Sequence, residues 1–171
     1  MPSTYTPIAT TTLGSAQASV SFSSFSGYTD LRLIIANAGS STGDTNIVFR
    51  LNSDSGSNYS VTNLGARALS TTPFSARQSS QTYGYLNWYS AIGSQKGMVI
   101  ADFMNYSNST TNKTILGSSR VNEGNATYSG VENTVNLWRS TAAITSIALT
   151  LGNGANFTSG STFTLYGIAS A

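Results

Sequence analysis

Few residues of this 171-residue chain have the types and spacing that catalysis requires. Residues 39–43, Gly-Ser-Ser-Thr-Gly, fit the G-x-S-x-G pattern of a hydrolase nucleophile elbow. That elbow needs a histidine base and a turn from a strand into a helix, whereas this segment is polar and the chain contains no histidine. We therefore expect residues 39–43 to form a hairpin connection and not a catalytic turn.

The chain also contains no cysteine, so thiol and imidazole chemistry, zinc sites with His or Cys ligands and disulfide bonds are all excluded. Its acidic residues are Asp30, Asp44, Asp54, Asp102, Glu123 and Glu132. Two of them could in principle pair as a glycosidase acid and base, and Asp44 and Asp54 could offer oxygen ligands to calcium. Because no EF-hand spacing is present, we expect solubilising or ion-paired carboxylates, no enzyme and no cofactor.

An aromatic segment at residues 83–89, Tyr-Gly-Tyr-Leu-Asn-Trp-Tyr, is the densest aromatic cluster in the chain. Strand alternation would place Tyr83, Tyr85, Asn87 and Tyr89 on one face, with Leu86 and Trp88 on the other. Tyrosines in a row could fill a subunit interface or stack on sugar rings, or they could simply cover the outer side of a strand. Tyr83, Tyr85, Trp88 and Tyr89 are therefore candidate oligomer or glycan contacts.

Charged residues make up only 8% of the chain, against about 25% in typical proteins. The 8 basic residues are scattered and the formal net charge is +2, so we expect no nucleic-acid partner. No apolar run approaches the ~20 residues of a membrane helix, so we expect no membrane partner. Ser, Thr, Asn and Gly supply 83 of the 171 residues. A surface so poor in charge favours a protein that covers much of itself in a symmetric assembly.

The elements that must position these residues are predicted to be strands. Apolar residues alternate with polar ones in short runs, separated by Gly-, Asn- and Ser-rich turns. The expected strands cover residues 5–13, 17–22, 29–36, 46–52, 58–64, 81–88, 97–105, 112–119, 131–138, 144–151 and 161–168, some of which should merge or prove to be loops.

This pattern predicts an all-β fold, a single jelly-roll-like β-sandwich of about 8 to 10 antiparallel strands spanning residues 1–171. Pro7 marks residues 1–13 as an N-terminal arm or an edge strand. Residues 65–81 form the longest stretch without alternation, and we expect a long functional loop there.

The two ends of the chain resemble a known class of protein. Residues 135–150, VNLWRSTAAITSIALT, residues 156–157, NF, and residues 160–168, GSTFTLYGI, resemble the ending of small virion proteins of tailed bacteriophages, including cyanobacterial and marine ones. Residues 5–13, YTPIATTTL, resemble the start of the same proteins. The segments cover about a quarter of the chain, and the middle resembles nothing that we can name.

The resemblance implies a jelly roll that assembles as a homotrimer in the virion. The first hypothesis is a capsid decoration, or cement, protein that binds the major capsid protein on the outside of the head, after synthesis in the bacterial cytoplasm. Its expected capsid contacts lie in the N-terminal segment and in residues 65–81: Tyr5, Pro7, Arg67, Phe74 and Arg77. The alternative is a tail-fibre or spike domain that recognises host surface polysaccharide.

Overall fold

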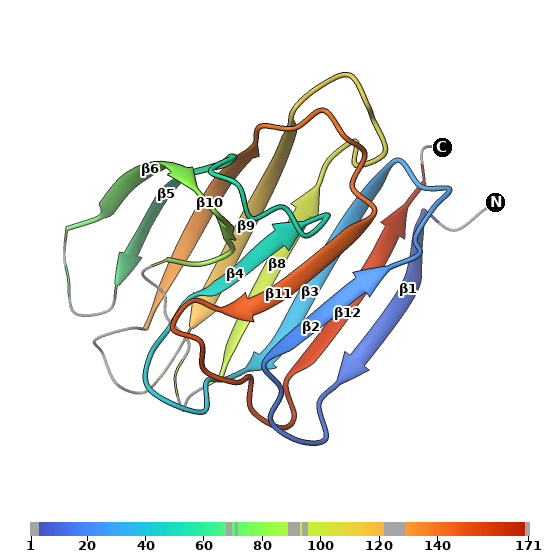
Figure 1. Cartoon of the computed structure of the whole chain (residues 1–171). Coiled ribbons are helices and arrows are strands. Elements are labelled where there is room, and N and C mark those ends of the chain that lie inside the picture. The colour runs from blue at the N-terminus through green and yellow to red at the C-terminus, as the bar shows by residue number, and fades with distance from the viewer. Residues whose placement is uncertain are drawn as a thin grey trace.

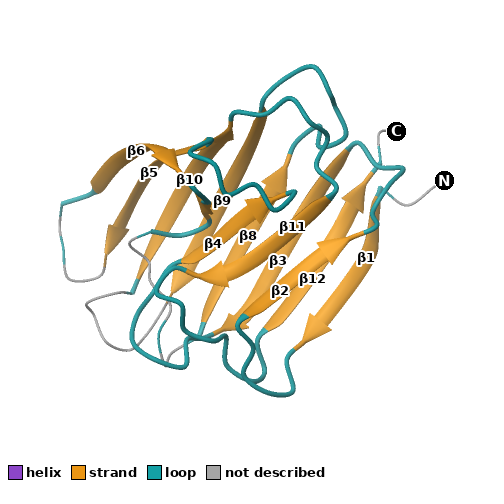
Figure 2. Ribbon diagram, in the orientation of Figure 1, coloured by secondary structure: helices purple, strands orange, loops and turns teal. Residues whose placement is uncertain are grey.

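The computed structural model describes residues 4–67, 70, 72–88, 93, 96–121 and 129–169. These residues form two antiparallel β-sheets that pack face to face, and no helix occurs among them (Figure 2). No helix long and apolar enough to cross a membrane is therefore present in this part of the chain. The predicted antiparallel β-sandwich is confirmed.

The larger sheet has eight strands in the order β1-β12-β3-β8-β9-β10-β5-β6. Their bounds are β1 Tyr5–Thr12, β3 Asp30–Ala38, β5 Tyr59–Arg67, β6 Phe74–Gln81, β8 Gly97–Phe103, β9 Lys113–Val121, β10 Gly130–Trp138 and β12 Thr162–Ile168. β1 is one edge of this sheet and β6 is the other. Pro7 therefore lies in an edge strand, where a residue without an N–H group removes no hydrogen bond from the interior of the sheet.

The smaller sheet has four strands in the order β2-β11-β4-β7. Their bounds are β2 Ser19–Ser23, β4 Ile47–Leu51, β7 Gly84–Tyr85 and β11 Ser146–Leu151. Figure 1 shows this sheet in front of the middle of the larger one, with β5 and β6 to one side. The eight-against-four arrangement does not establish the jelly-roll connectivity that the sequence suggested.

The core lies between the sheets and follows from the alternation of each strand. In β3, Leu31, Leu33 and Ile35 are fully buried, and in β11 Ile147 and Leu149 are. The largest buried rings form a contact chain between the sheets: Phe103, Phe49, Tyr59 and Trp138. Their centroids lie 5.9 to 6.4 Å apart, within the range of favourable aromatic pairs.

Residues 65–81 are the main error of the sequence prediction. They do not form a long loop, because β5 continues to Arg67 and β6 begins at Phe74, so most of the segment is a β-hairpin. β6 escaped detection because only Phe74 and Ala76 are apolar among its residues, FSARQSSQ. At a sheet edge, such a strand meets little core and needs few apolar residues. The described residues form twelve strands, more than the predicted eight to ten.

Candidate functional site

The aromatic segment is fixed to the inner face of the larger sheet by buried polar side chains of β10. The Asn136 side chain accepts a hydrogen bond from the Tyr85 N–H at 2.9 Å and donates one to the Tyr85 carbonyl at 2.8 Å. The buried Glu132 carboxylate accepts the Trp88 N–H at 3.0 and 3.1 Å and an N–H of Asn63 at 2.7 Å. The buried side chains of Asn136 and Glu132 thus hold the backbone of the segment in place.

A second set of hydrogen bonds joins the segment to β4. The side chain of Asn46 donates to the Trp88 carbonyl, and the Asn87 side chain accepts the Ile47 N–H at 2.6 Å. The Leu86 N–H donates to the Ile47 carbonyl at 2.9 Å. Bonds on both sides hold residues 84–88 between the two sheets, and only Gly84–Tyr85 pair as a strand, β7.

Two glycines allow this close approach. A Cβ on Gly84 would lie 2.2 Å from the ring of Phe49 in the opposing strand β4. A Cβ on Gly117 of β9 would lie 2.4 Å from the Thr134 hydroxyl and 3.0 Å from the Leu86 carbonyl. Neither position has room for a side chain, so the glycines let the aromatic segment pack against its neighbours.

The aromatic segment presents a ring cluster, which we define as Tyr83, Tyr85 and Trp88. Tyr85 stacks on Trp88 at 5.1 Å and 14°, and meets Tyr83 edge-on at 5.2 Å. Burial, and then the hydrogen bond with the Tyr83 side chain, raise the pKa of Tyr85, so its phenol keeps its proton to higher pH than an ordinary tyrosine does. The guanidinium of Arg50 on β4 lies 5.8 Å from the Tyr83 ring centroid.

The predicted two-sided arrangement of this segment is partly wrong. Tyr83 and Tyr85 do lie together, but Trp88 stacks on Tyr85 and does not point to the opposite side. Asn87, expected beside the tyrosines, is fully buried. The alternation fails because only residues 84 and 85 keep strand pairing. Tyr89, the fourth candidate contact, lies outside the described residues.

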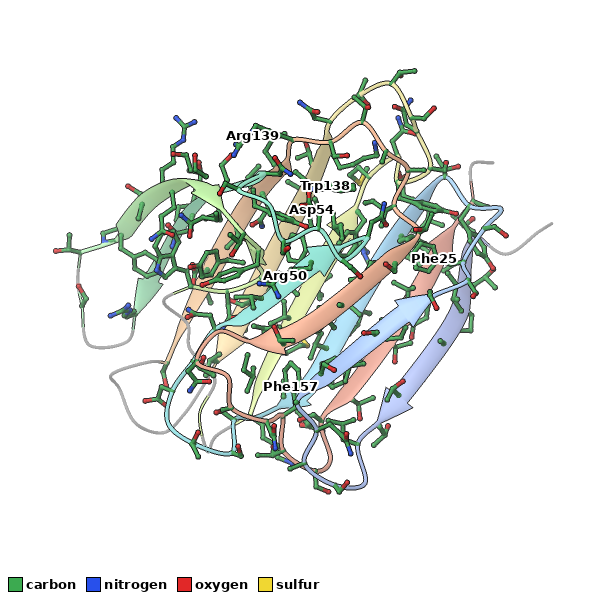
Figure 3. The ribbon with its side chains drawn as sticks, viewed as in Figure 1. Phe25, Arg50, Asp54, Trp138, Arg139 and Phe157 are labelled. Carbon is green, nitrogen blue, oxygen red and sulfur yellow. The ribbon has the colours of Figure 1, made fainter. Side chains whose placement is uncertain are left out.

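Beside Tyr83, a groove of about 360 Å³ crosses the outer face of the smaller sheet. Its lining residues are Ala18, Val48, Arg50, Tyr83, Thr150, Leu151, Gly152, Gly154 and Ala155. Arg50 and Val48 are the outward side chains of β4, and Thr150 pairs with Val48 from the neighbouring strand β11. Figure 3 labels Arg50 on β4, which lies between β11 and β7 in the smaller sheet.

The predicted capsid contacts do not form one site. Pro7 on β1 and Arg77 on β6 occupy the two edges of the larger sheet, at opposite ends of a single cross-strand row. Seven strand spacings of ~4.8 Å separate these edges by roughly 34 Å. Exposed Tyr5 hydrogen-bonds to Arg32 at 3.0 Å.

At the opposite edge, the guanidinium of Arg67 lies 5.5 Å from the Phe74 ring centroid. Arg77 is exposed on β6 and pairs with Thr62 of β5. The five predicted contacts thus divide into an edge pair, Tyr5 and Pro7, and a hairpin trio, Arg67, Phe74 and Arg77.

Between these edges lies an apolar face that the sequence prediction did not identify as a site. We define it as the apolar outward side chains Leu64, Met98, Ile100, Leu116, Val131 and Val135, from strands β5, β8, β9 and β10, which share this side with Arg120, Ser118 and Asn133. Five of them are between 38% and 59% exposed, and Ile100 is half-buried. Three shallow hollows open on this side of the sheet, the largest of about 690 Å³ between Met98 and Val131.

The signal for the apolar face is present in the sequence. In β8, Val99 and Ala101 face the core, yet the alternate residues Met98 and Ile100 are apolar too. In β9, Leu116 follows the core residue Ile115 directly. Consecutive apolar residues in a strand with one core-facing side indicate that its other side also meets apolar surface.

The outer face of the smaller sheet has a different composition. Its β2 and β11 side chains are Ser19, Ser21, Ser23, Ser146, Ala148 and Thr150, which we call the serine face. The three β2 serines are exposed, whereas Val20 and Phe22 between them are buried. Small hydroxyl groups therefore meet solvent on this side of the sandwich, beside the groove that Arg50 and Tyr83 line.

The carboxylates of the described residues mainly anchor the chain. Asp54 accepts hydrogen bonds from Trp138 Nε1 at 2.7 Å, Asn58 at 2.9 Å and the Gly56 N–H at 2.8 Å. These hydrogen bonds lower the pKa of Asp54 against the opposing effect of burial, which is the largest single cause. Figure 3 shows Asp54 beside Trp138 at one end of the sheets. The described residues contain no group of three or more acidic side chains able to hold a metal.

Two other charged groups have structural roles. Asp102 forms the Arg32 ion pair through two bonds of 2.6 and 2.9 Å. The ammonium of Lys113, a residue only 1% exposed, donates to the carbonyls of Thr111 and Thr141 at 2.7 and 3.2 Å. Burial lowers the pKa of Lys113.

The hydrolase-like segment 39–43 is a loop between β3 and β4 and not the expected hairpin connection, because β3 belongs to the larger sheet and β4 to the smaller one. The N–H of Ser41 donates to the Asn156 carbonyl at 2.9 Å, and the Thr158 N–H donates to the Gly39 carbonyl at 3.0 Å. The Ser40 hydroxyl bonds to the Thr42 carbonyl at 3.0 Å. These bonds tie the connection between β3 and β4 to residues 156–158.

Comparison with models of known protein families gives no match, and no curated protein is significantly similar to the chain.

Proposed function

We propose that this protein is a structural component of a tailed-phage virion, a capsid decoration protein that assembles with copies of itself through the apolar face. The single observation that carries the proposal is the apolar face itself. Five large apolar side chains on adjacent strands remain substantially exposed although the sandwich already has a filled core. Contiguous exposed apolar patches mark interaction sites.

A second copy of the chain is the occupant that we favour for the apolar face. A decoration protein must stay dissolved until it meets the shell, and only 8% of this chain is charged to keep it dissolved. Covering the apolar face with another copy removes the patch from water before the shell is reached. The Arg32–Asp102 pair beside the patch is already neutralised, which lowers the cost of burying it.

The size of the sheet is sufficient for such contact. Five strands from β3 to β5, each about eight residues long, cover roughly 630 Å² when strands lie ~4.8 Å apart and rise ~3.3 Å per residue. A standard interface buries about 800 Å² per partner. The two areas are of the same order. The number of copies, three, comes from the resemblance of the chain ends to phage proteins that trimerise.

In this arrangement, the edges of the larger sheet remain available for the shell. The edge pair, Tyr5 and Pro7, and the hairpin trio, Arg67, Phe74 and Arg77, lie on opposite sides of the apolar face. We propose that they contact neighbouring capsid subunits. A protein that binds only the assembled shell stabilises that shell by mass action and needs no catalytic group.

Counting copies per virion tests this role. Quantitative mass spectrometry of purified particles should find hundreds of copies of the chain, located on the head. Tens of copies or fewer, located on the tail, would contradict decoration and favour the tail-fibre alternative.

Light scattering of the purified protein tests the self-association step. We expect a trimer at micromolar concentration, and a monomer would contradict the assignment of the apolar face to a second copy.

A further inference from the structure

The groove beside Tyr83 contains one cation with unused donors. Arg50 Nε donates to the Thr82 carbonyl at 3.1 Å, and the guanidinium lies over the Tyr83 ring. Its two terminal nitrogens form no hydrogen bond or ion pair with any residue that the structure describes. A guanidinium whose plane is fixed and whose two terminal nitrogens are unused can bind a carboxylate through two parallel hydrogen bonds.

The rest of the groove is uncharged. Its sheet side presents Val48 and the Thr150 hydroxyl, and the ring of Tyr83 adds a large amphipathic surface. Residues 152–155 complete the lining, where Gly152 and Gly154 expose backbone without side chains. No acidic side chain lines the groove within the described part of the chain, so an anionic ligand would meet no like charge there.

Hydroxyl and backbone groups beside an aromatic ring are features that bind a polyol. The unused terminal nitrogens of Arg50 favour a polyol that also carries a carboxylate. We propose that this groove binds an acidic saccharide, with a carboxylate on Arg50 and a sugar ring against Tyr83. A volume of about 360 Å³ lies near the small end of ligand pockets, ~300 to 1,000 Å³, and fits one or two sugar rings.

The position of the groove favours a saccharide over a peptide or nucleic acid. An extended peptide would be expected to add to a sheet edge, whereas this groove lies across the face of β4 and β11. Nucleic acid would require several cations along a track, and the groove has one. The serine face continues beside the groove and is also neutral.

The groove is held in shape without ligand. The hydrogen bonds of Asn136 and Glu132 fix residues 85–88, whose rings support Tyr83. A pre-formed site loses little conformational entropy on binding. Because the groove is on the smaller sheet, it stays open when copies associate through the larger one, and the saccharide proposal does not depend on the proposed function.

Calorimetric titration of the full-length protein with digalacturonic acid tests the proposal. Its dimethyl ester, which keeps both rings and removes both charges, is the matched probe. We expect the acid to bind at least about tenfold more tightly than the ester, as expected for one charge-assisted contact. Equal binding of the two, or no binding of the acid at millimolar concentration, would overturn the proposal.

Variants locate the site. Arg50→Gln should weaken binding of the acid about tenfold or more, and Arg50→Lys should weaken it less because the charge is kept. Arg120→Gln makes the same charge change on the larger sheet and should leave binding within about twofold. Equal losses in Arg50→Gln and Arg120→Gln would show that only net charge matters and would overturn the assignment.

A peptide control separates the two sources of a carboxylate. An acetylated, amidated Gly-Glu-Gly peptide should bind at least about tenfold more weakly than digalacturonic acid, because it lacks the sugar rings. Equal affinity would show that the groove recognises any carboxylate and would overturn the saccharide assignment. The acid, ester and peptide comparison uses the wild-type protein, so it decides the proposal even if a variant fails to fold.

Discussion

The two outer faces of the sandwich differ although both inner faces contribute to one apolar core. Both sheets contribute aliphatic and aromatic residues to the core, for example Leu33 from β3 and Leu149 from β11. Outside, the larger sheet presents Leu116 and Val135, whereas the smaller sheet presents Ser21. Since both sheets already bury apolar residues between them, we propose that the outer difference reflects what each face meets: protein on one side and water or ligand on the other.

The largest expected effect separates the core from the apolar face at adjacent positions of one strand. Ile115 is fully buried and Leu116 is 42% exposed. Ile115→Ala should lower the free energy of unfolding by about 2 to 5 kcal/mol through lost burial and the cavity left behind. Leu116→Ala should cost less than about 1 kcal/mol within the monomer. Urea unfolding followed by tryptophan fluorescence checks both, and equal losses would refute the assignment of Leu116 to the outer face.

The next effect concerns assembly. Val135→Asp should weaken self-association by roughly a hundredfold, because association would bury an unpaired carboxylate against apolar side chains. Ser21→Asp introduces the same charge on the serine face and should leave the molar mass unchanged. Light scattering across a dilution series measures both variants. Dissociation by Ser21→Asp, with Val135→Asp still assembled, would exchange the roles of the two faces.

Much of the fold could be predicted from alternation alone. Strands such as β2 and β10 carry one buried and one exposed set of residues, which the period of two marks directly. β6 was not predicted because an edge strand buries little. The 81–88 prediction was wrong because Trp88 is fixed by the side chains of Asn46 and Glu132, and Asn87 by its own side chain, rather than by a ladder. Such long-range bonds leave no local pattern.

The candidate sites were less predictable than the strands. Tyr83, Tyr85 and Trp88 stood out by density, but Arg50 lies over 30 positions earlier in the chain and meets them only because β4 pairs with β7. Pro7 and Arg77 were both predicted as capsid contacts, but the sequence did not show that the strand order places them at opposite edges. Pairing order depends on the whole set of contacts, so no single segment of sequence reveals it.

The pH dependence of unfolding tests a residue of the core, Tyr59, and involves neither outer face. Burial raises the pKa of Tyr59 to about 12, from an ordinary value near 10. Between these values the unfolded chain releases the phenolic proton and the folded chain keeps it, so this contribution to stability is complete below pH ~10 and falls as pH rises toward 12. The difference between the urea unfolding midpoints at pH 9 and pH 11 should therefore be smaller in Tyr59→Phe than in the wild type. Equal differences would contradict this role for Tyr59.

The smallest effect is expected on the serine face, where a change of polarity should alter stability very little. Ser21 is exposed between two buried residues, so Ser21→Val keeps the strand pattern and should shift the free energy of unfolding by less than about 0.5 kcal/mol. The reciprocal change, Val135→Ser, should be nearly as mild in the monomer, since Val135 is 50% exposed. It should nevertheless weaken self-association several-fold, because the valine methyl groups would no longer be buried between copies. Unfolding and light scattering on the same two variants therefore separate stability from assembly. A loss of association in Ser21→Val, or none in Val135→Ser, would mean that the apolar face is not where the copies meet.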